Sequence, residues 1–329
     1  MTLDQIAKEL GVSKSTVSRA ISGKGRIGSA TRGRILSYIN MQEEVQTESA
    51  AASSLTNCLS VVIPNDVYSD GIPYFHECLL GVCEAATLMD YHVLITTGLT
   101  NDISAIRSLV ENRKVDGIIL TRSLENDLAL RYLAESHFPT GVTGRCDYEE
   151  ILQVDIDNER ASEELTSLLI SRGYRKFALI VGEMNYHVNR SRYAGFYNAI
   201  LKNNLSREKQ KIYTGSTQIE LLDAMLNDIM SDKVDCIICG DDVICTRVMS
   251  RLQAEGYRIP RDISIASLYN SPNLNCFSPA ITAINVSARL IGNMVGKQMI
   301  QQIRGQEYDR VINLDYEILL RKSTGYLVP

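Results

Sequence analysis

The sequence lacks tryptophan altogether and has only four histidines, five phenylalanines and seven prolines among its 329 residues. The histidines show no HExxH or other ligand spacing, so no metal site is expected. Neither a GxSxG nucleophile elbow nor a Walker phosphate loop occurs in the sequence. These absences argue against an enzyme, and no cofactor is predicted.

Long apolar stretches are also missing. A membrane span needs about eighteen consecutive apolar residues, and no segment approaches that length. The first ten residues carry charges and have no apolar centre, unlike a secretory signal peptide. We therefore expect a cytoplasmic protein without a membrane partner.

The eight cysteines are scattered through apolar segments, which favours reduced core residues over a disulfide framework. Cys236 and Cys239 have the spacing of a metal or redox pair. They lie in an apolar strand pattern, however, where residues three apart point to opposite faces of the sheet. We expect both to be buried core residues.

Charge is distributed unevenly along the chain. Residues 1–40 contain seven Lys or Arg against two acidic residues, a net charge of +5. Because the net charge of the whole chain is −5, the rest of the chain has a net charge of −10. A basic segment joined to an acidic one is typical of a protein whose basic part contacts a polyanion. Charge alone leaves chance clustering on a solvated surface equally open.

Residues 1–40, called the head below, contain three short amphipathic patterns. Thr2 can cap a first helix that Gly11 ends, Ser13 can cap a second, and a third begins near Ser29. Two short helices joined by a tight turn and packed on a third predict a helix-turn-helix. The predicted inward faces are Leu3, Ile6, Ala7 and Leu10, then Val17, Ala20 and Ile21, then Ile35, Leu36 and Ile39.

The outward face of the second helix has the side chains that reading of DNA requires. Arg19 can donate two hydrogen bonds to O6 and N7 of guanine, and Lys14 can reach a base or a phosphate. Ser15, Thr16 and Ser18 are short enough to let the helix lie deep in the major groove. The face consists of Lys14, Ser15, Ser18, Arg19 and Ser22.

The run from Thr2 to Ile21 resembles the head of the lactose/galactose repressor family almost position for position, and Val12-Ser13-x-x-Thr16-Val17-Ser18-Arg19 is that family's hallmark. The resemblance implies that Lys14 and Ser15 read variable operator positions. It also implies that Thr16, Ser18 and Arg19 contact bases and phosphates, and that Arg26 and Thr31 lie near the DNA backbone.

Residues 41–57 are polar, small and locally acidic, with three glutamates and neither proline nor arginine, as expected of a linker. The family usually carries here a Tyr-x-Pro-Asn-x-x-Ala-Arg hinge, which wedges leucines into the minor groove. This chain lacks that motif. A short helix from Ala50 to Leu55 would leave Leu55 as the only candidate wedge. The predicted DNA-binding residues are thus Thr2, Ser13, Lys14, Ser15, Thr16, Ser18, Arg19, Ser22, Arg26, Thr31 and Leu55.

From residue 58 onward strand and helix patterns alternate, which predicts parallel sheets wrapped by helices in two similar lobes. The second lobe starts near Asp157 and ends with the strand at 263–268. A ligand of such a body binds at the carboxyl ends of the strands, between the lobes. The predicted strands are 59–63, 92–97, 115–121, 177–182, 211–214, 236–240 and 263–268.

The body also resembles the effector-binding part of the same family, which shares its fold with periplasmic sugar-binding proteins. The resemblance rests on the segments Asp157-Asn158, Arg192-Tyr-Ala-Gly-Phe and Asp241-Asp242. It implies that Arg192 binds the effector and that Tyr269 stands where the family often has an aspartate.

Arg192 and Asp242 offer a donor and an acceptor for neighbouring hydroxyls, and Tyr74, Phe75 and Tyr186 can face the apolar side of a sugar ring. The predicted effector-binding residues are Tyr74, Phe75, Arg145, Tyr186, Arg192, Asp242 and Tyr269.

The sequence thus predicts an α + α/β fold, with a helix-turn-helix head (1–40), a linker or hinge (41–57) and a two-lobed body resembling periplasmic binding proteins (58–329). We expect a homodimeric transcription repressor that binds double-stranded operator DNA and responds to a small sugar-like effector. Three alternatives stay open: a phosphorylated sugar, an effector of another kind, or no effector, with the body serving for dimerisation.

Overall fold

The structure, a computed structural model, describes residues 3–23, 27–38, 55–65, 73–98, 102–215 and 219–325. The chain folds as two compact units, Met1–Thr56 and Asn57–Pro329. The head lies in the first unit and the body in the second. No helix among the described residues is long and apolar enough to cross a membrane.

The head contains α1 (Leu3–Leu10), α2 (Lys14–Ser22) and a helix over residues 29–38. Ser13 Oγ accepts a hydrogen bond from the backbone N of Thr16 at 3.2 Å, which confirms the predicted cap of α2. Gly23 ends α2 with a positive φ of 71°, a conformation that glycine adopts without strain. The buried side chains of the three helices form one small core of Ile6, Ala7, Val17, Ala20 and Ile35.

Two of the predicted inward residues are wrong. Ile21 is 49% exposed and Leu36 is 38% exposed. The core between helices of two to three turns is so narrow that Val17, Ala20 and Ile35 fill it. Ile21 and Leu36, each next to one of these buried residues, therefore lie at the edge of the core. Ile39 and the predicted cap Thr2 lie outside the described residues.

The body contains two six-stranded sheets in its described part. In the first sheet every neighbouring pair is parallel, in the order β11-β5-β4-β3-β1-β2. Long apolar strands without alternation are expected when helices cover both faces. The strands are β1 (Cys58–Pro64), β2 (His92–Gly98), β3 (Gly117–Leu120), β4 (Thr140–Thr143), β5 (Leu152–Ile156) and β11 (Val311–Leu314).

The second sheet has the order β12-β10-β9-β8-β6-β7 and is parallel except for the antiparallel pair of β10 and β12. Its strands are β6 (Phe177–Val181), β7 (Lys211–Thr214), β8 (Cys236–Cys239), β9 (Ser264–Ser267), β10 (Thr282–Asn285) and β12 (Glu317–Leu319).

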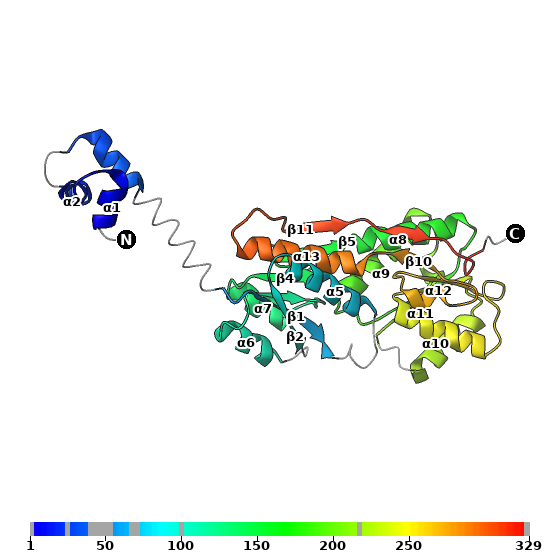
Figure 1. The fold of residues 1–329 in the computed structure, drawn as a ribbon. Helices are drawn as coiled ribbons and strands as arrows, with labels where there is room; N and C mark the ends of the chain where they lie inside the picture. The colour runs from blue at the N-terminus through cyan, green and yellow to red at the C-terminus, as the bar shows by residue number, and fades with distance from the viewer. Residues whose placement is uncertain are drawn as a thin grey trace. The chain divides into compact units, whose positions relative to one another are not determined.

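Helices cover both faces of each sheet and define the two lobes (Figure 1). In the first lobe, α5 (Pro73–Leu88) and α13 (Ala288–Ile303) pack on one face, and α6 (Ser104–Glu111) and α7 (Leu128–Glu135) on the other. In the second lobe, α8 (Asn158–Ser171) and α9 (His187–Lys202) cover one face. The other face is covered by α10 (Ile219–Ser231), α11 (Asp242–Ala254) and α12 (Pro272–Asn275).

The axes of α5 and α13 come close because glycines face each other. A Cβ on Gly292 would lie 2.0 Å from the carbonyl oxygen of Cys78, and one on Gly81 would lie 2.0 Å from that of Arg289. Gly195 allows the same close approach of α9 to α8 in the second lobe. Each lobe thus has one tightly packed helix pair.

The chain passes between the lobes three times: at Asp157, at residues 286–287 and at residues 315–316. The predicted start of the second lobe near Asp157 is confirmed. The predicted end at 263–268 is wrong, because β10 and β12 extend the second sheet and α13 and β11 return to the first. β4 and β5 were also missing from the prediction.

Cys236 and Cys239 lie fully buried on opposite faces of the second sheet, Cys236 against α8 and α9 and Cys239 against α10 and α11. They cannot hold one ion together. Among the described residues, no group of three or more His, Cys, Asp or Glu side chains is placed to bind a metal.

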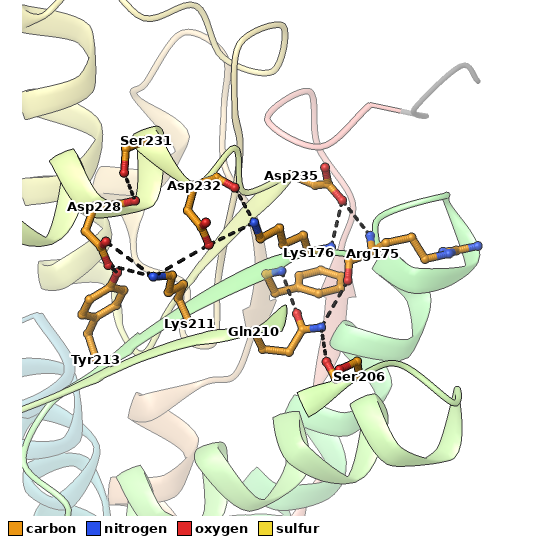
Figure 2. A network of polar contacts seen from close by, with 11 residues as sticks. Arg175, Lys176, Ser206, Gln210, Lys211, Tyr213, Asp228, Ser231, Asp232 and Asp235 are labelled. Carbon is orange, nitrogen blue, oxygen red and sulfur yellow. Dashed lines mark hydrogen bonds and ion pairs between the residues drawn. The ribbon is translucent and has the colours of Figure 1, made fainter. Parts of the chain in front are cut away.

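A network of charged side chains joins the last turn of α10 to the amino ends of β6 and β7 (Figure 2). Lys176 and Lys211 bind Asp232, with Nζ–Oδ2 distances of 2.9 and 3.7 Å, and Lys211 also binds Asp228 at 3.2 Å. Tyr213 donates a hydrogen bond to Asp228. This network lies at the end of the second sheet opposite the carboxyl ends of its strands, where it ties a helix to the sheet.

Candidate functional site

The outward face of α2 is exposed as predicted. Ser13, Lys14, Ser15, Ser18, Arg19 and Ser22 are all exposed, while Thr16 and Thr31 are half-buried. Ser13 Oγ lies 2.9 Å from Ser15 Oγ and 2.7 Å from Thr16 Oγ1, so three hydroxyls cluster at the first turn of α2. Arg19 occupies the next turn of the same face.

The remaining predicted DNA contacts divide into two groups. Thr2 and Arg26 lie outside the described residues. Leu55 is half-buried and has no regular secondary structure, and the rest of the predicted helix from Ala50 lies outside the described residues. That any of these residues contacts DNA stays a prediction.

A cavity of ≈ 260 Å³ lies between the two lobes of the body, at the carboxyl ends of both sheets. Its wall comes from the segments that follow β3, β4 and β5 in the first lobe and β6, β8 and β9 in the second. The carboxyl ends of parallel strands meet at one edge of a sheet, so this edge gathers polar loop residues. The structure brings all seven predicted effector residues to this cavity: Tyr74, Phe75, Arg145, Tyr186, Arg192, Asp242 and Tyr269.

One side of the cavity is aromatic. Tyr74 meets Phe75 and Tyr269 in two edge-to-face contacts, with ring centroids 5.3 and 5.6 Å apart. Tyr74 and Phe75 open α5 in the first lobe, and Tyr269 follows β9 in the second. The three rings therefore form one aromatic wall that spans both lobes.

Arg192 lies on α9 and is only 9% exposed. Burial lowers the pKa of its guanidinium, while nearby Asp241 and Asp155 oppose that change. Its Nε is buried and has no hydrogen-bond acceptor among the residues that the structure describes. A buried donor without an acceptor costs free energy, and a ligand in the cavity would supply the acceptor.

Asp241 and Asp242 lie at the start of α11, directly after β8. Asp241 caps the helix by accepting a hydrogen bond from the backbone N of Ile244 at 2.8 Å. Asp242 is 2% exposed and lines the cavity, and burial raises the pKa of its carboxyl. The two neighbouring aspartates therefore have different surroundings.

Arg145 follows β4 and is anchored to β11, where it donates to the carbonyl oxygen of Ile312 at 3.3 Å and to the side chain of Asn313. Its Nη1 atom is buried and has no acceptor in the described part of the chain. A second guanidinium thus borders the cavity with an unused donor.

Asp155, which was not predicted from the sequence, lies on β5 and is 7% exposed at the cavity wall. Burial is the largest effect on its carboxyl and raises the pKa to about 6, although Ile156 N–H, Arg145, Arg192 and Asn158 favour the charged form. The available signal was a lone acidic residue inside the apolar run 152–156. A charge in such a run is rare unless it has a function.

Segments 122–126 and 183–190 bring the lobes into contact beside the cavity. The backbone N of Glu125 donates to the carbonyl oxygen of Asn185 at 2.8 Å, and Arg190 forms an ion pair with Glu125 at 2.7 Å. The guanidinium of Arg122 lies 4.4 Å from the ring centre of Tyr186, so one face of this predicted effector contact is covered by an arginine. The lobes are therefore held closed on this side by direct contacts.

Comparison with known proteins places both units. Residues 2–43 match the bacterial regulatory proteins of the lacI family, and residues 56–321 match the periplasmic binding proteins and sugar binding domain of the LacI family. The HTH-type transcriptional regulator CelR of Thermobifida fusca is 24% identical over 98% of each chain. The HTH-type transcriptional repressor PurR of Aliivibrio salmonicida is 27% identical over 99% of each chain.

Among solved structures, a complex of the transcriptional regulator CelR with cellobiose has the same fold, with a TM-score of 0.74 and 23% identity. The match covers 98% of this chain and 99% of that one. The chain therefore belongs to the LacI family of bacterial regulatory proteins: it is a transcription regulator, not an enzyme, with a DNA-binding head and a body of the sugar-binding type.

Proposed function

We propose that the chain is a cytoplasmic, homodimeric repressor that binds operator DNA through α2 and releases it when a neutral sugar binds between the lobes of the body. The observation that carries the proposal is a cavity with an aromatic wall and two guanidinium groups, each with one buried donor atom that has no acceptor among the described residues. A protein that reads operator DNA works where the DNA is, which supports the cytoplasm.

The exposed face of α2 supports reading of the major groove. Short hydroxyl side chains at its first turn permit close approach, and Arg19 one turn later can reach a guanine. The operator contacts of the head are expected to be those predicted from the sequence, with Lys14 and Ser15 as the residues that set the preferred operator.

The charges around the cavity favour a neutral effector over a phosphorylated one. Three arginines, at 122, 145 and 192, face four acidic residues, at 155, 183, 241 and 242. A site for a phosphate normally has a surplus of donors and positive charge. A sugar offers hydroxyls that both donate and accept, together with an apolar ring face for Tyr74 and Tyr269. The cellobiose bound by CelR supports this class of effector.

The edge of the first sheet supports a homodimer. β2 is one of the two edge strands of the sheet as described, and its side chains are exposed or half-buried on both faces. Leu94 and Ile95 are 40% and 49% exposed, and Leu88 at the end of α5 is 84% exposed. Exposed apolar edge strands are normally covered, and a symmetric second copy covers the same surface on both chains.

The experiment that tests the proposal is a titration of the full chain against fluorescently labelled DNA that flanks its own gene, beside scrambled DNA, at two salt concentrations. The label must be on the DNA because the chain has no tryptophan. We expect preference for one site by about 10³-fold or more. Addition of cellobiose or another neutral mono- or disaccharide is expected to release the complex.

Weak binding to every DNA sequence that disappears at moderate salt would contradict specific binding to an operator. Specific binding that no sugar of the panel changes would contradict the effector and favour a body that serves for dimerisation.

A further inference from the structure

Asp155 combines deep burial with few structural partners. Its Oδ1 accepts a hydrogen bond from the backbone N of Ile156 at 2.8 Å, and its Oδ2 accepts one from Asn158 Nδ2 at 2.9 Å. A carboxylate has about four acceptor positions. The described residues therefore use about half of them, and the carboxylate borders the cavity.

Arg145 and Arg192 lie near Asp155 from two sides. Both favour its charged form electrostatically, Arg145 from the first lobe and Arg192 from the second. Within the part of the chain that the structure describes, neither guanidinium forms an ion pair with Asp155 within 4.0 Å, and each keeps a buried donor atom without an acceptor. A purely structural triad would be expected to close on itself, because unpaired buried charges are costly.

A hydroxyl group has the chemistry to bind both kinds of charge. It donates its hydrogen to a carboxylate oxygen and accepts a hydrogen bond from a guanidinium N–H, so one hydroxyl satisfies both groups. Two neighbouring hydroxyls on a sugar ring can do so toward both arginines. One backbone N–H and one side-chain amide already fix the carboxylate in place, so little conformational freedom is lost on binding.

We propose that Asp155 is an effector-binding residue, which accepts hydrogen bonds from neighbouring hydroxyls of the sugar while Arg145 and Arg192 donate to the same hydroxyls. This inference rests on the proposed function and adds a determinant of effector class: the carboxylate selects a neutral polyol and opposes a phosphate or carboxylate at that position.

The inference also gives effector affinity a pH dependence. The groups that face Asp155 are Arg145 after β4, Asn158 on α8, Arg192 on α9, and Tyr74 and Cys78 on α5. The ionised carboxylate accepts more hydrogen bonds than the protonated one, so binding favours ionisation. Affinity is expected to fall as the pH drops through about 6 and the carboxyl takes up a proton.

The test is isothermal titration of the full chain at pH 5, 6 and 7.5, with cellobiose first and then a panel of neutral mono- and disaccharides, and with glucose 6-phosphate for comparison. Three proteins are compared: wild type, Asp155→Asn and Asp157→Asn. Asp157 is the matched control because it is exposed, caps α8 through the backbone N of Arg160, and does not line the cavity. Asparagine caps a helix about as well as aspartate.

For the sugar that binds wild type, we expect affinity about tenfold weaker at pH 5 than at pH 7.5. Asp155→Asn should bind at least tenfold more weakly at pH 7.5 and lose most of the pH dependence, while Asp157→Asn should behave like wild type. Operator binding by each variant checks that it is folded.

Equal affinity of wild type and Asp155→Asn for a neutral sugar would overturn the role of Asp155 and leave the operator and effector functions standing. Tighter binding of glucose 6-phosphate by wild type than of any neutral sugar would overturn both the role of Asp155 and the neutral class of effector, and leave operator binding standing. Failure of every panel member to bind wild type would overturn the sugar effector itself, and this inference with it.

Discussion

Burial of the Asp155 carboxyl raises its pKa from the ordinary 3.8 to about 6, and a shift in this direction destabilises the fold at neutral pH. A carboxyl whose pKa is raised in the folded state contributes most favourably below its unfolded pKa. That contribution is lost as the pH rises through the folded pKa. The residue is 7% exposed, so solvent screens the effect little.

We therefore expect Asp155→Asn to stabilise the effector-free protein. At pH 7.5 the gain in unfolding free energy should approach about 3 kcal/mol, since each pKa unit corresponds to about 1.4 kcal/mol. At pH 5 it should fall to roughly half of that. Urea unfolding followed by circular dichroism at both pH values measures the difference. A gain that does not change with pH, or a loss at pH 7.5, would contradict the assigned burial cost.

Arg19 should contribute sequence preference rather than only charge. Substitution by alanine is expected to weaken binding to the preferred site by about 1–3 kcal/mol and to reduce the difference from scrambled DNA. Lys8→Ala is the matched control, because Lys8 is an exposed cation of the head on α1. Lys8→Ala should weaken binding to the preferred site and to scrambled DNA by the same factor, as measured by fluorescence anisotropy. A similar result for Arg19→Ala would count against the major-groove contact.

Much of the cavity could be predicted residue by residue because its side chains follow strands that are visible in the sequence. Asp242 is the second residue after the apolar run at 236–240, and Tyr269 comes directly after the run at 263–268. Asp155 was missed because it lies inside its strand, where a single acidic residue interrupts the apolar pattern. The unused donors of Arg145 and Arg192 depend on packing between lobes, which no local pattern encodes.

At the scale of elements, the close pair of α5 and α13 depends on two glycines that meet a neighbouring backbone. Gly292→Ala would place a Cβ 2.0 Å from the carbonyl oxygen of Cys78, and a backbone atom cannot move aside as a flexible side chain can. We expect a loss of about 3 kcal/mol or more in unfolding free energy, at the upper end of overpacking.

Gly296→Ala, on the same helix, is the comparison. Its Cβ would meet the side chain of Ala85 at 3.2 Å, so a small adjustment suffices and the loss should be clearly smaller. Thermal unfolding of the two variants ranks them. A Gly296→Ala protein as unstable as Gly292→Ala would contradict the role assigned to the backbone contact.

The elements missed from the sequence are mostly short. β4, β5, β10 and β12 have three to five residues, too few for a periodic pattern to stand out from chance. β10 is defined by its pairing with β9 in the folded sheet, because pairing with neighbours and not intrinsic propensity determines such short strands. α13 contains two glycines, which lower its apparent helix propensity although they are required by its packing on α5.

At the scale of the whole molecule, the exposed edge at β2 determines the expected assembly. Ile95→Glu should place a charge on each side of a symmetric interface and shift the protein to monomers. Leu201→Glu is the control, because Leu201 is 50% exposed near the end of α9 in the second lobe. Sedimentation of the three proteins measures assembly, and operator affinity should fall only for Ile95→Glu. A wild-type monomer, or a dimeric Ile95→Glu protein, would contradict the β2 interface.

Because the chain passes between the lobes three times, the two lobes complete their folding in a fixed order as the protein is synthesised at the ribosome. The second lobe, apart from its edge strand β12, is encoded by the continuous stretch from α8 to β10 and can bury most of its core as that stretch emerges. The first lobe begins earlier in the sequence, but it cannot finish folding until later residues emerge. The face of its sheet that α5 shares with α13, and the strand β11, are completed only by residues 288–314, near the end of synthesis. Late in translation, the second lobe is therefore nearly complete while one apolar face of the first lobe is still uncovered. That interval is when a chaperone would be needed most.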